Sequence, residues 1–190
     1  GGDPYVGRLM TSQSIEESGG VKVIDIESLP DEALILPIAM MGAPTVMVEK
    51  FPSGNEFAQL IPLIENLLTK PVSAILCAEA GGLNSTIPFV AASKLGLPII
   101  DGDAMGRAFP ELQMVTFTLG GISATPMAMV DEKGNGCTFD TISNVWTEKL
   151  ARAITIQMGG SAMCSLYPVT AKQCKDYIIR GSLSLIHHIG

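Results

Sequence analysis

Val72-Ser-Ala-Ile-Leu-Cys77 and Pro98-Ile-Ile100 are the two short apolar runs that decide the fold of this chain. Runs of this length, bounded by Pro, Gly or Asp, are typical of buried strands. Between them, residues 86–95 are predicted to form a helix that ends at Gly96, since glycine readily adopts the left-handed conformation after a helix. Strand, helix and strand in succession predict a right-handed β-α-β unit with parallel strands.

The rest of the chain adds strands and helices to this unit. Further strands are predicted at residues 21–26, 33–40, 112–119, 127–130, 137–141 and 162–167. Further helices are predicted at residues 53–68, 143–158 and 170–188. Pro37 predicts an edge strand or a bulge, because proline lacks the N–H that a central strand donates. The fold class is therefore α/β, with a mixed or mostly parallel sheet and helices on both faces.

Two of these helices show a one-sided apolar pattern. The first starts near Ser53 and has apolar residues at Phe57, Leu60, Ile61, Ile64, Leu67 and Leu68. The second has apolar residues at Val145, Trp146, Leu150, Ile154 and Met158. Such helical spacing predicts one face that packs on the sheet. Asn84 or Ser85 is expected to cap the helix of the β-α-β unit.

Composition excludes several classes of function. The chain has 190 residues, a net charge of −7 and 47% hydrophobic residues, which predicts one domain with an aliphatic core. Its twelve Lys and Arg form no basic stripe, so neither nucleic acid nor an anionic membrane is an expected partner. The four cysteines form no C-x-x-C pair. Free thiols without a visible export signal predict a cytoplasmic protein.

Both ends of the sequence resemble cuts in a longer chain. Gly1-Gly-Asp-Pro-Tyr5 lacks an initiator Met, and residues 183–190 read as a helix that stops early. We therefore expect residues 1–190 to be a single α/β domain that forms the N-terminal part of a larger protein. Its apolar surface should then pack against the C-terminal domain of that protein, or against a second copy in a homo-oligomer.

Ligands in open α/β sheets bind beyond the carboxyl ends of the strands, where two loops are predicted. In the first loop, Gly81 and Gly82 precede a helix N-terminus, whose free N–H groups suit an anion. Glu79 and Asn84 flank these glycines, and all four residues are candidates for binding a small-molecule substrate. The alternative is an ordinary turn between strand and helix.

The second loop follows the other parallel strand and carries Asp101, Asp103 and Arg107. The carboxylates suit a general base or a divalent metal such as zinc, and the arginine suits an anionic substrate. We predict these three residues to be catalytic and to converge on one cavity with the first loop. The alternative is a helix cap with a surface salt bridge.

Asp3 is a further candidate for substrate binding, because Gly1 and Gly2 before it permit a tight loop. The alternative is a disordered terminus. His187 and His188 are adjacent on a predicted helix, so their side chains diverge by about 100°. They are therefore not expected to form a metal pair one helical turn apart.

Gly1-Gly-Asp-Pro-Tyr5 and Asp101-Gly-Asp-Ala-Met-Gly-Arg-Ala-Phe-Pro-Glu-Leu-Gln-Met114 together resemble the S-methyl thiohydantoin desulfurase domain family. The resemblance extends along nearly the whole chain, including residues 79–84. It implies the N-terminal domain of a larger, hydantoinase-associated enzyme of the hydrolase type. Such an enzyme cleaves a C–S bond in an S-methylated thiohydantoin ring and releases a thiol. The alternatives are a non-catalytic regulatory or assembly domain of a hydantoinase-type system and, on the two glycines of the first loop, a phosphate-binding domain.

Overall fold

The computed structural model describes residues 3–50, 52 and 54–190. The two N-terminal glycines and Ser53, where a tight loop and a helix start were predicted, lie outside the described residues. The helices are α1 (Pro4–Ser18), α2 (Pro44–Glu49), α3 (Glu56–Leu68), α4 (Ile87–Leu95), α5 (Thr116–Leu119), α6 (Asn144–Gln157), α7 (Ala171–Tyr177) and α8 (Ser182–Ile189), with a 3-10 turn, η1 (Ile26–Ser28). The strands are β1 (Val23–Ile24), β2 (Leu34–Gly42), β3 (Val72–Cys77), β4 (Ile99–Asp103), β5 (Met127–Val130), β6 (Gly136–Phe139), β7 (Ser161–Ser165), β8 (Val169–Thr170) and β9 (Ile179–Arg180).

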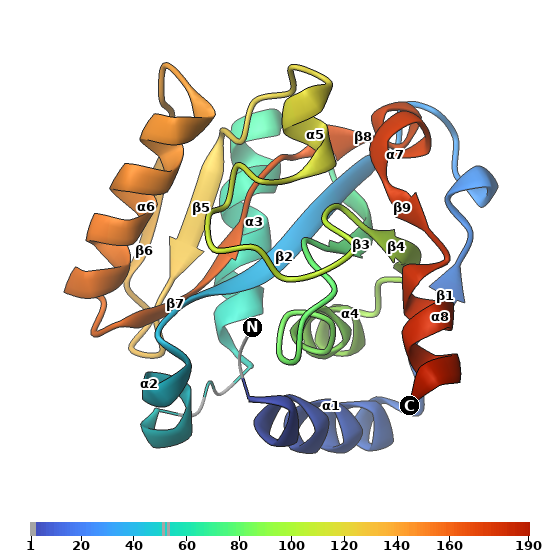
Figure 1. Cartoon of the computed structure of the whole chain (residues 1–190), viewed down its shortest axis with the longest axis horizontal. Helices are drawn as coiled ribbons and strands as arrows, with labels where there is room; N and C mark the ends of the chain where they lie inside the picture. Colours follow the sequence, from blue (N-terminus) through green and yellow to red (C-terminus); the bar gives the residue numbers. More distant parts are fainter. Residues whose placement is uncertain (1–2, 51, 53) are drawn as a thin grey trace.

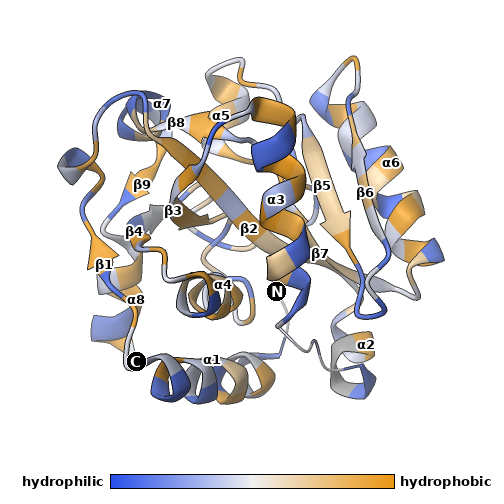
Figure 2. Cartoon of the chain, turned by 180° about the vertical axis from the view of Figure 1, so that it is seen from behind, coloured by the Kyte–Doolittle hydropathy of each residue, from blue (hydrophilic) through white to orange (hydrophobic). Residues whose placement is uncertain are grey.

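These strands form one mixed sheet, which confirms the α/β fold class (Figure 1). The strand order is β1-β4-β3-β2-β7-β5-β6, with β8 paired to β2 and β9 to β4. The core strands β1, β4, β3 and β2 are parallel, whereas β7, β5 and β6 join them antiparallel. Helices cover both faces: α3 and α4 lie on the face seen in Figure 2, and α5, α6 and α7 pack on the other.

The predicted β-α-β unit is confirmed. β3 and β4 are parallel neighbours, with Ile75 opposite Ile99, and α4 joins them. Gly96 ends α4 with a φ of 66°, and its N–H donates to the carbonyl of Ala92. The strands predicted at 127–130 and 137–141 are also confirmed, and they pair antiparallel as the hairpin of β5 and β6.

Pro37 does not mark an edge, because β2 is a central strand. On its antiparallel side, β2 pairs with β8 up to Ile35 and with β7 from Ile38 onward. Pro37 lies in the interruption between these two ladders, and its carbonyl accepts the N–H of Leu166. The missing N–H of proline therefore removes no ladder bond.

Two other predicted elements are wrong. Residues 112–119 form a loop and the short helix α5 instead of a strand; Thr116 donates its N–H to the carbonyl of Ala104, so this segment folds back over the sheet. The final helix is broken into α7 and α8, because residues 179–180 extend to pair with β4 as strand β9. Gly181, with a φ of 71°, then redirects the chain into α8.

The apolar face predicted for the helix at 143–158 is largely exposed. Val145 is 51% exposed and Trp146 is 47% exposed, whereas Thr147, Ala151 and Thr155 are buried. These small side chains let α6 approach the sheet closely. The periodicity of apolar residues does not identify this buried face, because its residues are not the large apolar ones. For α3, the predicted face from Phe57 to Ile64 is confirmed and the side chain of Leu67 is exposed. In the part of the chain described, no helix combines the length and apolarity needed to cross a membrane.

Replacing Gly96 by Ala should lower the free energy of unfolding by about 1 kcal/mol, because a β-carbon disfavours positive φ. Nothing lies within 4 Å of where that β-carbon would be, so the loss is purely conformational. Urea unfolding followed by far-ultraviolet circular dichroism measures it. Gly96→Asn should lose less, since asparagine tolerates this conformation; equal losses for both variants would contradict this account.

Candidate functional site

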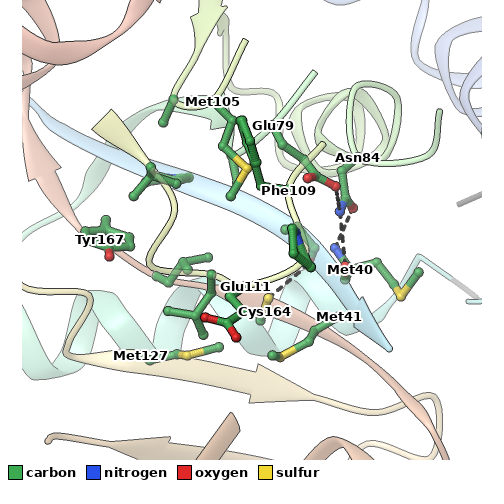
Figure 3. Close-up of a pocket in the computed structure, with 18 of the residues that line it drawn as sticks. Met40, Met41, Glu79, Asn84, Met105, Phe109, Glu111, Met127, Cys164 and Tyr167 are labelled. Atoms are coloured by element: carbon green, nitrogen blue, oxygen red, sulfur yellow. Dashed lines mark hydrogen bonds between the residues drawn. The ribbon is translucent and has the colours of Figure 1, made fainter. Parts of the chain in front are cut away.

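A cavity of about 230 Å³ lies beside the carboxyl half of β2 (Figure 3). β2 continues past the end of β3, where Ile38 pairs with Cys77, so residues 39–41 have no strand neighbour on that side. The loops that follow β3 and β4 close around this free length of strand. The cavity lies beyond the carboxyl end of β3, and ligands in open α/β sheets bind beyond the carboxyl ends of the strands. The polar side chains that line the cavity are Glu79, Asn84, Glu111, Arg152, Cys164 and Tyr167.

Asn84 fills the place of the missing strand and holds Glu79 in the cavity wall. Its side-chain oxygen accepts the N–H of Met40 at 2.8 Å, and its amide donates to the Met40 carbonyl at 3.2 Å. The same amide donates to Oε1 of Glu79 at 2.7 Å. Asn84 therefore does not cap α4, as one alternative predicted; it links β2 to a buried carboxylate (Figure 3).

Cys164 and Tyr167 line the cavity from the antiparallel side of β2. Cys164 donates its thiol to the carbonyl of Ala39 at 3.4 Å, and burial raises its pKa to about 12. Burial likewise raises the pKa of Tyr167 to about 12, against the opposing effect of a 2.6 Å hydrogen bond with Thr118. Both groups are therefore neutral at physiological pH, and neither is an activated nucleophile.

The loop that follows β4 covers the cavity, and an ion pair on α6 holds it in place through hydrogen bonds. Nε of Arg152 donates to Oε1 of Glu148 at 2.9 Å, and its guanidinium also donates to the carbonyl of Pro110 at 3.2 Å. Oε2 of Glu148 accepts the N–H of Leu112 at 3.0 Å. The pair therefore binds two points of the covering loop. Sequence reasoning missed it, because α6 was interpreted through its apolar residues alone.

Asp103, predicted to be catalytic, is buried between the two loops. Its Oδ2 accepts three backbone N–H groups, those of Ala80 at 2.9 Å, Met105 at 3.0 Å and Gly106 at 2.7 Å. Its Oδ1 is buried and has no hydrogen-bond partner among the described residues. Asp103 therefore joins the loop that carries Glu79 to the loop that carries Met105, and does not line the cavity itself.

Asp101, Arg107 and Asp3 do not line the cavity either. Asp101 accepts the N–H of Ser184 at 3.0 Å at the start of α8. Arg107 is exposed, with its guanidinium 5.8 Å from the ring centre of Phe109. Asp3 caps α1 by accepting the N–H of Tyr5 at 2.7 Å. The structure therefore does not bring Asp101, Asp103 and Arg107 together on this cavity.

The first loop is divided in the same way. Glu79 and Asn84 line the cavity, whereas Gly81 and Gly82 do not. The Gly81 carbonyl accepts the N–H of Ser85 at 3.0 Å. This bond is typical of the ordinary turn between strand and helix that was the alternative to a binding loop. Whether any of these residues binds substrate stays a prediction.

Two related sequence profiles together cover the chain. The S-Me-THD-like N-terminal domain matches residues 1–141, and the S-Me-THD-like C-terminal domain matches residues 142–190. The chain belongs to the S-Me-THD-like family. Both segments of this family build one sheet, since β7 from the second pairs with β2 from the first. The cavity is also shared, with Glu79 from the first segment and Arg152 from the second.

A crystal structure of a protein from Chromobacterium violaceum has a similar fold, with a TM-score of 0.81 and 23% identity. The match covers 97% of this S-Me-THD-like chain and 54% of that protein, so the chain spans about half of that relative. No curated protein matches the chain. That residues 1–190 form one domain at the N-terminus of a larger protein stays a prediction.

The carboxylates of the second loop do not fit a metal site. Among residues 3–50, 52 and 54–190, no three His, Cys, Asp or Glu side chains cluster as metal ligands. Asp103 is surrounded by backbone N–H groups and Asp101 holds the start of α8, so neither presents a carboxylate to a shared point. A divalent metal such as zinc stays a prediction.

The four thiols of this S-Me-THD-like protein should react very unequally with iodoacetamide at pH 8. Burial raises the pKa of Cys77, Cys164 and Cys174, so almost none of their reactive thiolate forms. Cys137 is only half-buried, although burial raises its pKa as well. Mass spectrometry should show one adduct, on Cys137, and four after unfolding in urea. Early labelling of Cys164 would contradict its burial.

Proposed function

We propose that the cavity binds an S-methylated thiohydantoin ring and hydrolyses its C–S bond. The observation that carries this proposal is the buried carboxylate of Glu79 in the wall of a small, mainly apolar cavity. Family membership supports a substrate of this class. Drug-sized ligands occupy pockets of about 300–1,000 Å³, so a cavity somewhat below that range suits a single substituted ring.

The reaction needs a base for water and an acceptor for the ring. Water attacks the ring carbon that bears sulfur while Glu79 takes its proton, and the C–S bond then breaks. As the C–S bond breaks, the proton on Glu79 passes to the departing methanethiolate. The second proton of the water goes to the ring nitrogen that was doubly bonded to the attacked carbon, and that carbon becomes a carbonyl. The sum is ring–SCH₃ plus water giving a hydantoin plus methanethiol. Glu79 also provides carboxylate oxygen as an acceptor for a ring N–H.

Cys164 and Tyr167 contribute no charge to this mechanism, because both are neutral. Arg152 is bound to Glu148 and to the covering loop, so its part is to hold that loop closed. Exclusion of water by the loop strengthens the electrostatic effect of Glu79.

The test is to incubate the purified protein with an S-methyl thiohydantoin in water labelled with oxygen-18. The expected products are methanethiol in the headspace and a hydantoin that carries the label in its new carbonyl. A heat-denatured sample provides the control. Absence of methanethiol above that control would overturn the proposal, and methanethiol without the label would exclude direct attack by water.

An assembly role is the second candidate, and a different observation favours it. Val145, Trp146 and Leu150 of α6 are each more than 40% exposed, whereas Thr147, Ala151 and Thr155 lie on its buried side. Apolar residues gathered on one surface mark interaction sites. We propose that this face binds a second copy or a further domain. Light scattering that shows only monomers, unchanged by Trp146→Ser, would count against self-association.

With four free thiols, we also propose a cytoplasmic location.

A further inference from the structure

We infer that Asn84 is a positioning residue for the proposed reaction, because it fixes the carboxylate of Glu79 against the central strand of the sheet. This inference rests on the proposed function, since it concerns how the base of the same site is held. Its basis is the set of hydrogen bonds that the Asn84 side chain makes, which allow only one orientation of its amide.

The backbone of Met40 determines which way the Asn84 amide points (Figure 3). The Met40 N–H donates to Oδ1 of Asn84 at 2.8 Å, so the oxygen end of the amide faces that group. The NH₂ end then donates to the Met40 carbonyl at 3.2 Å and to Oε1 of Glu79 at 2.7 Å. A flipped amide would turn its oxygen toward a carbonyl and a carboxylate, both of which are acceptors. The amide therefore presents a hydrogen to Glu79.

Strand β2 gives this amide a rigid support. Met40 pairs with Met163 of β7 on one side of β2, and Asn84 takes the place of a strand neighbour on the other. Asn84 and Glu79 are only 8% and 6% exposed, so water competes little for the hydrogen bond between them. A group supported by a strand of the scaffold is held more precisely than one supported by a loop alone.

A separate contact holds the backbone next to Glu79 and leaves its side chain to other contacts. Oδ2 of Asp103 accepts the N–H of Ala80 at 2.9 Å, which fixes the loop directly after Glu79. The glutamate side chain can still rotate about its own bonds, so the direction of its carboxylate depends on what that carboxylate contacts. Asn84 supplies such a contact at Oε1. Because a misplacement of about 1 Å can cost about 10²-fold in rate, this contact should matter for turnover.

Asn84→Ala should lower kcat for methanethiol release by about 10- to 100-fold and change KM less, because the ring still fits while the base is less well placed. In a Glu79→Gln background, the same change should cost no more than about twofold, since the base that Asn84 positions is already absent. Equal losses in the two backgrounds would show that Asn84 acts on the shape of the cavity and not through Glu79. That result would overturn the inference.

Asn144→Ala is the matched control, because Asn144 makes the same kind of contacts outside the cavity wall. Its Oδ1 accepts the N–H of Ala124 at 2.8 Å, and its amide donates to the Ile122 carbonyl at 2.9 Å. Both alanine variants should lower the melting temperature, but Asn144→Ala should retain the parental kcat. An equal loss of kcat in both would show a general effect of destabilisation and would overturn the inference.

Nuclear magnetic resonance of the side-chain amide tests the contact without turnover and without a change at Asn84. Both ends of this NH₂ group donate to buried acceptors, so its hydrogens should exchange slowly with solvent. Glu79→Gln should shift one of the two hydrogen signals to higher field, because a neutral acceptor replaces a charged one. Signals that do not respond to Glu79→Gln would overturn the inference, even if the Asn84 variant fails to fold.

The outcomes also separate the two proposals. If the amide signal responds to Glu79→Gln but the parental protein releases no methanethiol, the reaction is wrong and the placement of Glu79 by Asn84 stands. If methanethiol is released and Asn84→Ala costs the same in both backgrounds, the positioning role is wrong and the reaction stands.

Discussion

Asp103→Ala is expected to lower the free energy of unfolding by about 3–5 kcal/mol, because it leaves buried backbone N–H groups without an acceptor. Oδ2 of Asp103 accepts the N–H groups of Ala80, Met105 and Gly106, and the side chain is fully buried. A buried donor left without an acceptor costs about 1–3 kcal/mol. Urea unfolding followed by far-ultraviolet circular dichroism measures the loss.

Asp101→Ala is the matched control, since Asp101 lies two residues away on the same strand. It holds the start of α8 at the partly exposed edge, and the loss of such a cap costs about 1 kcal/mol. Asp103→Asn should fall between the two, because the amide oxygen still accepts hydrogen bonds but without a charge. Losses of similar size for both alanine variants would show that Asp103 does not stabilise the two loops.

The β-α-β unit could be predicted because its signals are local. The strand at 72–77 is a short apolar run, and Gly96 ends the helix that follows. Together these place the loop that carries Glu79 and Asn84 at the carboxyl end of β3, where the cavity lies. This part of the site followed from the chain order of strand, helix and strand.

The rest of the site depends on pairing between distant segments. Cys164 and Tyr167 reach the cavity because β7 pairs antiparallel with β2, more than a hundred residues earlier in the chain. No local periodicity specifies that pairing. The direction of the Asp103 carboxylate is not visible in the sequence for a related reason, since only the folded loops place it against backbone N–H groups.

Exposure was hardest to predict where small side chains form the contact surface of a helix. Thr147, Ala151 and Thr155 bury the inner face of α6, whereas Trp146 stays half exposed. Apolar periodicity identifies the face with the largest hydrophobic side chains, yet close packing of a helix on a sheet favours small ones. Glu148 is buried on this inner face only because it binds Arg152 and the N–H of Leu112.

Glu79→Gln is expected to reduce the rate of methanethiol release by about 10²- to 10⁴-fold, the usual contribution of a general base. Glutamine has nearly the same size, and its side-chain oxygen can still accept the amide hydrogen of Asn84 that reaches Glu79 at 2.7 Å. The variant therefore retains the shape of the wall but loses the group that takes the proton from water. Binding of a benzyl hydantoin should persist, so the loss should appear in kcat more than in KM.

Glu16→Gln, on the exposed side of α1, controls for the change of one surface charge and should retain full activity. The melting temperature of Glu79→Gln should remain within a few degrees of the parent, because the hydrogen bonds from Asn84 to Met40 do not involve residue 79. A folded Glu79→Gln protein that binds the ring and releases methanethiol at the parental rate would show that another group activates the water. A variant that neither melts normally nor binds the ring would instead show that Glu79 shapes the cavity, and activity alone would then say nothing of its role as a base.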